Sequence, residues 1–441
     1  MKSKIIISFI ILLRFISIAP AVSAQQKPKE WDLRSCINYA LENNIQIKMQ
    51  QQSVEIGKVD FEQSKAEKLP NLNGGIGQSF TNQMAASGSN QEQSYTGNYS
   101  LKSEMVLYNG NKLNNTISQN ELLVKAGELT VKQAENNMEL TITAAYLKIL
   151  YAKESVVNAE NTLISSETQN NRAKILFESG YIAESNYAQV QSQYSKDKYA
   201  LVLANNALDL LKLQLKQLLQ LGINDTLVIQ FPVLDDKQVL KALPVKQEVF
   251  NTALNTMPEV ENSKVNMDVA AIDLDIAKAG LLPSLSLSAS LATGHSSLAS
   301  ENYATQLGNN FYQNAGLSLN IPIFNKKQVK STISKAQIGI ETAKLSYAET
   351  QTNLLTEVET AYLDAVSAQS RFQAAAEQLK FTLVSYSLIE EQFNLGMKNT
   401  VELLTEKTNY LTAQQEYLQA KYAAILNYKI LDFYQNKQIE L

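Results

Sequence analysis

Two stretches in the second half of the chain alternate between apolar and polar residues. In residues 284–291 every odd position is Leu or Ala and every even position is Ser, and in residues 315–323 the odd positions are again apolar. Because successive side chains of a β-strand point to opposite faces, this period predicts a β-hairpin over residues 284–323 with one apolar and one polar face. Such a hairpin fits a soluble sheet that covers a core, and it also fits an outer-membrane barrel with lipid outside and water inside.

A second hairpin is predicted at residues 71–107. Its second strand alternates cleanly, with apolar positions such as Tyr99 and Leu101. Glycines interrupt its first strand, which indicates curvature or the close approach of another backbone. The segments that join the strands, residues 82–94 and 294–310, are rich in Ser, Asn and Gln and are predicted to be polar loops.

Two long segments, residues 112–221 and 326–436, are predicted to form helical hairpins. Neither contains proline, and a first helix of about 68 residues would extend over about 100 Å. Gly180 and Gly396 divide each segment into an outgoing and a returning helix. Apolar residues recur at steps of three and four, which is the spacing of a coiled-coil seam; an ordinary helical bundle would show the same seam, but the helix length argues against it. In the second segment the predicted seam contains Leu355, Val358, Tyr362, Ala365, Gln369, Phe372, Ala376, Leu379, Leu383 and Tyr386.

The two halves of the chain repeat one plan. Lys65-Ala66 and Leu69-Pro70 recur 213 positions later, and Ala145-Tyr146-Leu147 recurs 216 positions later. The change of three residues falls in the hairpin loops, where insertions are tolerated. We therefore predict an internal duplication. Its parts are a first repeat at residues 25–222, a linker at residues 223–244 and a second repeat at residues 245–441.

Each repeat is predicted to begin with one helix, over residues 33–68 and 245–281. A Leu-Pro pair ends each helix, because proline disfavours the helical conformation in the residue before it. Gly222 is predicted to cap the last helix of the first repeat. In the linker, residues 225–231 are predicted to form a short strand.

Residues 1–24 are predicted to be a secretory signal peptide. Lys2 and Lys4 precede the apolar stretch 5–18, and the small residues 22–24 form a cleavage site. The apolar stretch is too short for a membrane-spanning helix. Removal of the signal would take away three basic residues and no acidic residue, and the net charge would change from −4 to −7. This charge, without a basic patch, argues against a nucleic-acid partner.

Cysteine and histidine occur once each. Cys36 cannot form an internal disulfide and is predicted to be a small buried helix residue. His295 lies in a Ser-rich loop and is predicted to be solvated. No HExxH, P-loop or GxSxG motif is present, and the paired acids Glu390 and Glu391 are predicted to lie on a solvated helix face. We therefore expect no enzyme activity, metal site or cofactor.

Four strands of about ten residues cannot close an outer-membrane barrel, which needs about eight or more. Open sheet edges are not tolerated in lipid. If the hairpins lie in a membrane, several chains must contribute strands to one barrel. Secretion and the barrel length of the strands favour this arrangement, in which the helical hairpins would form a tube in the periplasm.

This plan resembles the TolC-like outer membrane efflux protein family, the outer membrane factors of tripartite export systems, over nearly the whole secreted chain. Leu-Pro precedes each hairpin, and Leu-Tyr-Asn-Gly at 107–110 and Ile-Phe-Asn at 323–325 follow them. Ala-Leu pairs near the start of each repeat and glycine turns at both helix tips complete the resemblance.

The resemblance implies a mixed α and β membrane protein: a homotrimer with a twelve-stranded outer-membrane barrel, four strands per chain, above a long antiparallel α-helical coiled-coil barrel. It implies a passive exit duct for efflux or type I secretion in the outer membrane of a Gram-negative bacterium. Its partners would be outer membrane lipid, a periplasmic adaptor (membrane fusion) protein and an inner-membrane pump of RND, ABC or MFS type. The alternative, a secreted structural coiled coil without a channel, leaves the hairpins unexplained. The sequence does not identify the substrate.

The resemblance also assigns two candidate sites near the helix tips. The predicted adaptor-docking residues are Gly180, Tyr181, Ile182, Ala183, Gly396, Met397, Lys398 and Asn399. The predicted periplasmic gate contains Lys398, Glu402, Thr405 and Glu406. The family often has two acids here; Glu402 matches the first position, but Thr405 occupies the second. Lys398, Glu402 and Glu406 follow at steps of four and share one helix face, which is either a solvated stripe or the lining of a closed pore.

Overall fold

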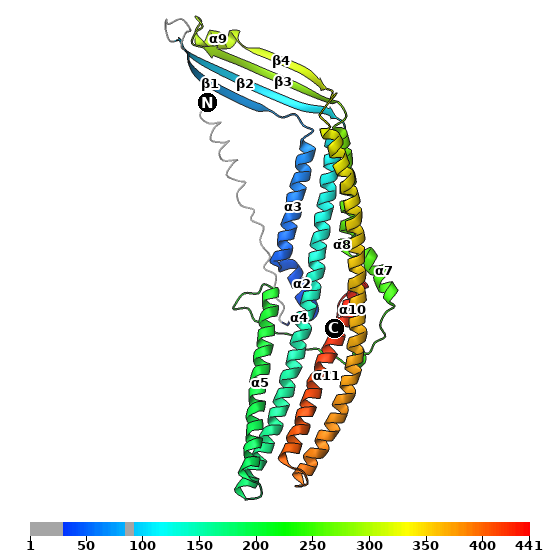
Figure 1. Cartoon of the computed structure of the whole chain (residues 1–441). Helices are drawn as coiled ribbons and strands as arrows, with labels where there is room; N and C mark the ends of the chain where they lie inside the picture. Colours follow the sequence, from blue (N-terminus) through cyan, green and yellow to red (C-terminus); the bar gives the residue numbers. More distant parts are fainter. Residues whose placement is uncertain (1–29, 84–91) are drawn as a thin grey trace.

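The computed structural model describes residues 30–83 and 92–441, so the predicted signal peptide lies outside the described residues. The chain is strongly elongated (Figure 1). A β-sheet lies at one end, long helices run away from it, and the turns of two helical hairpins form the other end. The linker lies at the middle of the molecule, so the architecture has three levels along its length.

All four strands form one antiparallel sheet in sequence order. They are β1 (Asn73–Gln83), β2 (Glu92–Asn109), β3 (Ser284–Ser296) and β4 (Tyr312–Asn320). Both predicted hairpins are present, and the pairing of β2 with β3 joins the two repeats. β4 ends at Asn320, so Ile321 and Ile323, predicted to be strand residues, lie after the strand instead. Pro322 between them cannot donate a ladder hydrogen bond.

The pairing register gathers most apolar residues of the four strands on one face. Leu101 lies opposite Leu291, and Leu287 lies opposite Leu317. Ile76 and Leu317 on this face are 80% and 67% exposed, so the chain itself leaves most of the face uncovered. The other face carries mostly polar residues. A sheet whose apolar face the chain leaves mostly exposed lacks the core that a soluble sheet would cover.

His295 lies within β3, where it pairs with Gly97. Its ring occupies the space above this glycine, since a Cβ on Gly97 would lie 2.1 Å from the imidazole. The ring also contacts Tyr99, and it contacts Tyr303 of the short helix α9 (Tyr303–Asn309), which packs on β3. The prediction of a solvated loop histidine was wrong, because β3 continues beyond the alternating residues that revealed it.

Each repeat begins with two helices where the sequence predicted one. They are α2 (Leu33–Asn43) and α3 (Ile45–Ala66) in the first repeat, and α7 (Lys246–Thr256) and α8 (Pro258–Ala279) in the second. The first break falls at Asn44, whose side chain accepts the backbone N–H of Gln46 and caps α3. The second falls at Met257, which adopts an extended conformation before a proline.

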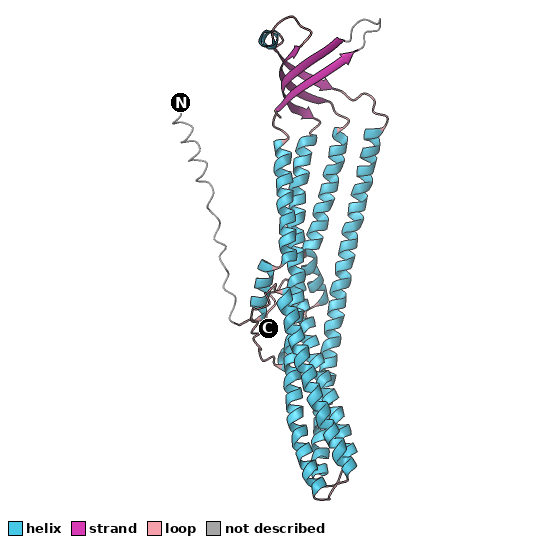
Figure 2. Ribbon diagram, turned by 90° about the vertical axis from the view of Figure 1, so that its left-hand side faces the viewer, coloured by secondary structure: helices cyan, strands magenta, loops and turns pink. Residues whose placement is uncertain are grey.

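The long helical hairpins are present as predicted. They consist of α4 (Lys112–Glu178) with α5 (Glu184–Leu218), and of α10 (Gln328–Asn394) with α11 (Thr400–Tyr434). Near the sheet the helices pack in the order α3, α4, α8, α10, and toward the tips in the order α5, α4, α11, α10 (Figures 1 and 2). α10 therefore forms one edge of this layer, which α7 covers at the middle of the molecule, and α3 and α5 form the other edge.

Two finer predictions about the helices were wrong. α5 ends at Leu218, and Gln220, with φ of 55°, adopts the left-handed conformation that was predicted for Gly222. In α10, Leu355 and Leu383 of the predicted seam are 39% and 44% exposed. The residues that α10 buries follow a heptad register that shares one of its two positions with the predicted seam. The other position lies one residue earlier in the chain than predicted.

The largest buried cluster lies at the middle of the molecule, beside the linker. Trp31, Cys36 and Tyr146 are buried there, and Tyr146 donates hydrogen bonds to backbone carbonyls of the segments that meet at this level. Burial raises the pKa of the Cys36 thiol to about 12, in agreement with the predicted buried helix residue. Residues 225–231 do not form the predicted strand; they contribute one parallel bridge, from Ile229 to Trp31.

Candidate functional site

The two helical hairpins turn through the same backbone motif. Gly180 and Gly396 each have a φ of 76°, a conformation that glycine adopts at no steric cost. At the first tip the N–H of Gly180 donates to the Phe177 carbonyl, and the N–H of Tyr181 donates to the Leu176 carbonyl. This pair of bonds is a Schellman motif, and the second tip repeats it. The predicted tip turns are thus present in both repeats.

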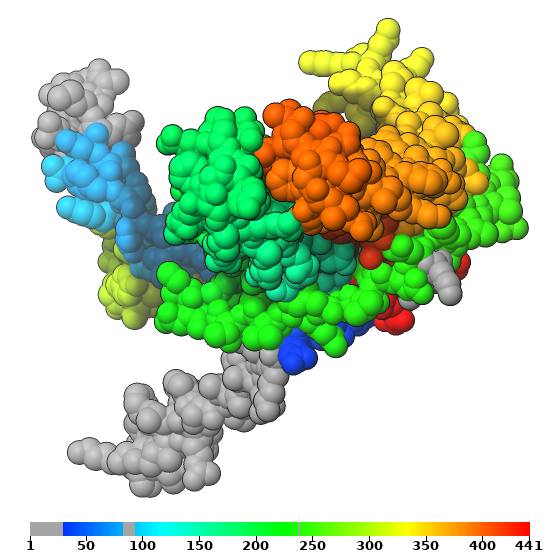
Figure 3. Space-filling model, turned by 90° about the horizontal axis from the view of Figure 1, so that it is seen from below, coloured from blue at the N-terminus to red at the C-terminus, as the bar shows by residue number. Residues whose placement is uncertain are grey.

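The tips expose large apolar side chains. Tyr181 is 80% exposed, and Leu395 and Met397 are each 69% exposed. Seen from below, the two hairpin ends lie side by side, with the linker along one side of the molecule (Figure 3). The eight predicted docking residues therefore gather at the end of the molecule that is farthest from the sheet.

A capping box is present at the second tip and not at the first. Asn399 accepts the backbone N–H of Glu402 at 2.9 Å, and Glu402 Oε2 accepts the N–H of Asn399 at 3.1 Å. Glu402 Oε1 accepts a hydrogen bond from Lys398 Nζ at 2.6 Å. The bond from Lys398, followed by that from Asn399, holds the pKa of the Glu402 carboxyl below its usual range. At the first tip Ala183 provides no side-chain cap. The spacing Asn-x-x-Glu is the local signal for such a box, and it was not among the predicted features.

The four predicted gate residues have different surroundings. Lys398 and Glu402 are paired and partly exposed, at 32% and 41%. Glu406 points toward α10, where its Oε2 accepts a hydrogen bond from Ser385 Oγ at 3.0 Å. Thr405 donates to a carbonyl of its own helix. Lys398 and Glu402 therefore form one unit close to the tip, and Glu406 belongs to the contact between α10 and α11.

Polar contacts that the sequence did not predict join the two hairpins close to their tips. Gln169 of α4 donates to the Tyr386 hydroxyl at 3.1 Å and to Glu390 at 2.7 Å. Arg172 donates to the side chain of Asn394 at 2.6 Å and to its carbonyl at 2.9 Å. Burial and the nearby Glu390 carboxylate raise the pKa of Tyr386 to about 12. Glu390, predicted to lie on a solvated face, is half-buried in this contact.

A buried ion pair joins the hairpins farther from the tips. Lys407 Nζ lies 2.9 Å from Asp197 Oδ2, and the two side chains are 3% and 5% exposed. Ser166 of α4 donates to the same carboxylate oxygen and accepts from Lys407 at 2.7 Å, and Gln193 donates to the other oxygen at 2.7 Å. Both carboxylate oxygens have partners, which a buried charge requires. Lys407 lies 210 positions from Asp197 and 241 from Ser166, so local sequence patterns could not reveal the cluster.

Within the part of the chain that the structure describes, none of the helices is both long and apolar enough to cross a membrane. Over the same residues, no group of three or more His, Cys, Asp or Glu side chains could hold a metal ion.

A two-faced sheet without a core, carried on two long helical hairpins of one plan, is the architecture of a channel-forming membrane protein. The chain belongs to the outer membrane efflux protein family, whose model matches residues 36–220 and 249–433, once in each repeat. The predicted fold class and duplication are confirmed. The protein is an efflux channel of the outer membrane, and the alternative of a structural coiled coil without a channel was wrong.

Curated relatives resemble the chain over most of its length. Toxin and drug export protein A of Aggregatibacter actinomycetemcomitans is 22% identical over 402 residues, which cover 90% of this chain and 84% of the relative. Cation efflux system protein CusC of Escherichia coli (strain K12) is 23% identical over 416 residues, with the same coverage. Crystal structures of CusC and of the Campylobacter jejuni CmeC channel share the fold. For CusC the TM-score is 0.79 at 18% identity, with 94% of this chain and 96% of CusC covered. For CmeC the TM-score is 0.76 at 18% identity, with 91% and 85% covered.

Proposed function

We propose that three copies of this chain form one continuous duct, and the open sheet is the observation that carries the proposal. β1 and β4 lie at the two edges of the sheet, and unpaired strand edges are not tolerated in lipid. In a ring of three chains, β4 of each chain would pair with β1 of the next. The twelve strands would then form a barrel of ordinary size, with the apolar face toward lipid and the polar face toward water.

The helical layer supports the same ring. On α10, Ile338, Leu345 and Phe381 are between 65% and 72% exposed, and on α3 Ile56 and Val59 are 64% and 66% exposed. These residues lie on the two open edges of the layer. In a ring, α10 of one chain would cover α3 and α5 of its neighbour, and the apolar residues would leave water. The helices would thereby form a tube in the periplasm below the barrel.

We expect the protein purified in detergent to be a trimer, as measured by light scattering. The double variant Ile338→Asp/Leu345→Asp places charges on the α10 edge and should reduce the trimer fraction at least about tenfold, because an unpaired charge in a buried contact costs several kcal/mol. Met397→Asp is the matched control, since Met397 is equally exposed but lies at the tip, and it should remain trimeric. A monodisperse wild-type monomer with full β-content by circular dichroism would contradict the proposal.

The duct itself is passive in this proposal. A periplasmic adaptor protein would dock on the exposed apolar tips, and an inner-membrane pump of RND, ABC or MFS type would supply energy and select the cargo. Relatives of this fold carry different cargo in their names, toxins and drugs for one and cations for another. Cargo selection by the pump would explain how one duct architecture serves both.

Lys398 and Glu402 would set the ion preference of the closed end. If three copies of this pair surround the axis, the Glu402 carboxylates attract cations and repel anions, as charged rings do in other channels. We expect Glu402→Gln to lower the cation preference in planar-bilayer recordings, and Lys398→Gln to raise it. Both effects should shrink between 0.1 M and 1 M salt, as the screening length falls from about 10 Å to about 3 Å.

Glu341→Gln provides the control for this experiment. Glu341 is also exposed and paired with a lysine, at 2.7 Å, but it lies on α10 far from the tips. Its replacement should leave the reversal potential unchanged. If both tip variants keep the wild-type reversal potential at low salt, the Lys398–Glu402 pair only caps the helix and does not set the ion preference.

A further inference from the structure

Lysines gather where the helices meet the sheet. They are Lys68 after α3, Lys112 at the start of α4, Lys326 and Lys327 directly before α10, and Lys330 and Lys335 in its first turns. All six are exposed, and within the described residues none of them forms an ion pair. Lys65 and Lys278, at the same level, are paired with acids in their own helices. This junction therefore presents several lysines without an ion-pair partner, although the chain as a whole is acidic.

The turn before α10 keeps its lysines in an unfavourable backbone conformation. Lys326 and Lys327 have φ values of 50° and 65°, in the left-handed region that disfavours residues with a long side chain. The first repeat makes the same turn with Gly110 and Asn111, each with φ of 68°, the residue types that accept this conformation most readily. Strained backbone positions are maintained where the side chain has another use. Backbone conformation alone therefore does not explain why lysines occupy these two positions.

Apolar residues lie on the sheet side of these lysines. Ile323 is 94% exposed and Phe324 is 81% exposed, directly before Lys326, and Leu69 after α3 is 67% exposed. Apolar side chains followed by cations are typical of a segment at a membrane surface, where the former enter the interface and the latter remain in the headgroup layer.

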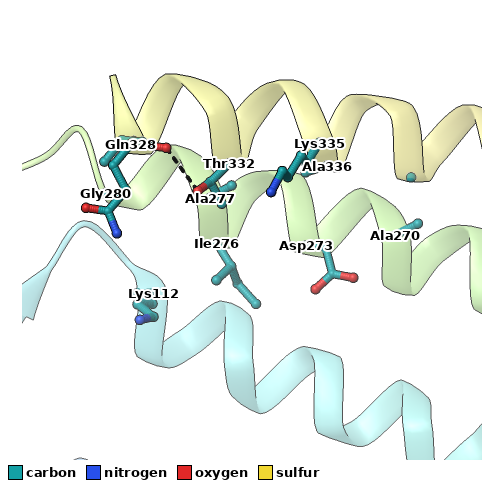
Figure 4. A pocket seen from close by; sticks show the side chains of 12 residues that line it. Lys112, Ala270, Asp273, Ile276, Ala277, Gly280, Gln328, Thr332, Lys335 and Ala336 are labelled. Carbon is teal, nitrogen blue, oxygen red and sulfur yellow. Dashed lines mark hydrogen bonds between the residues drawn. The ribbon is translucent and has the colours of Figure 1, made fainter. Parts of the chain in front are cut away.

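A groove provides space for a headgroup among these lysines. It has a volume of about 710 Å³ and lies between the sheet-proximal ends of α8 and α10, beside the start of α4 (Figure 4). Lys112 and Lys335 line it from two helices, and Ala277, Gly280 and Ala336 contribute small residues that leave the space open. Asp273, the acid that lines the groove, already accepts a hydrogen bond from Gln119.

We propose that this junction binds the headgroups of anionic phospholipids at the periplasmic surface of the outer membrane. The inference rests on the proposed function, which places the sheet in the membrane and the helices in the periplasm. The phosphate oxygens would accept hydrogen bonds from the ammonium groups of Lys326 and Lys327, and in the groove from those of Lys112 and Lys335. The contacts would fix the depth at which the barrel sits in the bilayer.

The test replaces the strained turn with that of the first repeat. The double variant Lys326→Gly/Lys327→Asn removes two charges and relieves the backbone, so its melting temperature should equal or exceed that of the wild type. A lysine near an anionic surface contributes about a fivefold gain in binding, so two lysines contribute about thirtyfold. Native mass spectrometry of the trimer with phosphatidylglycerol should therefore show a loss of affinity of about thirtyfold in low salt, and little difference in 1 M salt.

Lys344→Gln is the matched control, because Lys344 is an exposed lysine of the same helix that is paired with Glu341; it should bind phosphatidylglycerol as the wild type does. Phosphatidylethanolamine, which has no net charge, should bind all variants equally. Undiminished phosphatidylglycerol binding by the turn variant would overturn the proposal. The lysines would then be expected to form ion pairs with acids of a neighbouring chain instead. Light scattering and single-channel conductance of the same samples report the trimeric duct separately, so a failure of the duct would be recognised as such.

Discussion

Lys407→Ala is expected to destabilise the protein by about 3–5 kcal/mol, the usual cost of removing one partner from a buried ion pair. The substitution leaves the Asp197 carboxylate almost fully buried, with only Ser166 and Gln193 to compensate its charge. It also opens a cavity between α4, α5 and α11. The free energy of unfolding, from denaturant titration followed by helical circular dichroism, measures the effect.

A double variant separates the charge from the packing. Lys407→Met/Asp197→Leu removes both charges and keeps most of the volume, and well-packed apolar replacements of buried ion pairs are often neutral or stabilising. We expect it to recover most of the stability that Lys407→Ala loses. Lys344→Ala, which breaks an exposed pair, should cost less than about 1 kcal/mol. If Lys407→Ala costs no more than Lys344→Ala, the cluster does not hold the hairpins together.

The sequence revealed the elements that local periodicity defines. Alternation over residues 284–291 identified β3, and the constant offsets of 213 and 216 identified the duplication and both tip glycines. The strand and the turns were predictable because each contains its whole signal, and the duplication was predictable because short motifs recur in the same order at a nearly constant offset. The break at Asn44 was also local, since its side chain caps α3 through the N–H of Gln46, but it was not predicted.

Contacts between distant segments were not predictable from the sequence. Nothing near Gln169 or Lys407 in the sequence indicates a partner more than 200 positions away. In the α10 seam one of the two heptad positions was predicted one residue too late. Leu354 and Leu355 are both apolar, and only the packing against neighbouring helices shows that Leu354 is the buried one. His295 was misplaced because a strand can continue through residues without alternation when a glycine on the next strand leaves room for a ring.

The same limit applies to the candidate gate. A spacing of four placed Lys398, Glu402 and Glu406 on one helix face, but it did not show that Glu406 would contact α10. Helix periodicity gives the direction in which a side chain points from the axis of its helix. Whether it then points into a lumen or contacts another helix depends on where the neighbouring helices lie. The three-residue pattern alone therefore could not separate the Lys398–Glu402 pair from Glu406, and the gate remains a prediction.

Gly180→Asp and Gly396→Asp are expected to abolish export while the trimer remains intact. Each glycine has a φ of 76°, and no side chain or backbone atom lies within 4 Å of the position that a Cβ would occupy. The substituted side chain would therefore project from the tip rather than clash inside it. The cost to the turn is about 1–2 kcal/mol, which is small if the proposed trimer buries the apolar residues on its helix edges. A carboxylate beside Tyr181 or Met397 would, however, be desolvated by a partner that docks on these apolar residues, at a cost of several kcal/mol.

Two controls separate this docking effect from the strain. Gly396→Ala imposes the same backbone cost without a charge and should retain most of the export activity. Gly308→Asp introduces the same carboxylate at an open position of α9, at the opposite end of the molecule, and should leave export unchanged. Export by intact cells, with trimer levels followed by immunoblot and adaptor contact followed by crosslinking at Tyr181, measures all four variants. Normal export by both tip variants at normal protein levels would show that the tips are not part of the docking surface. A partner that tolerates a new carboxylate at either tip does not bury that tip.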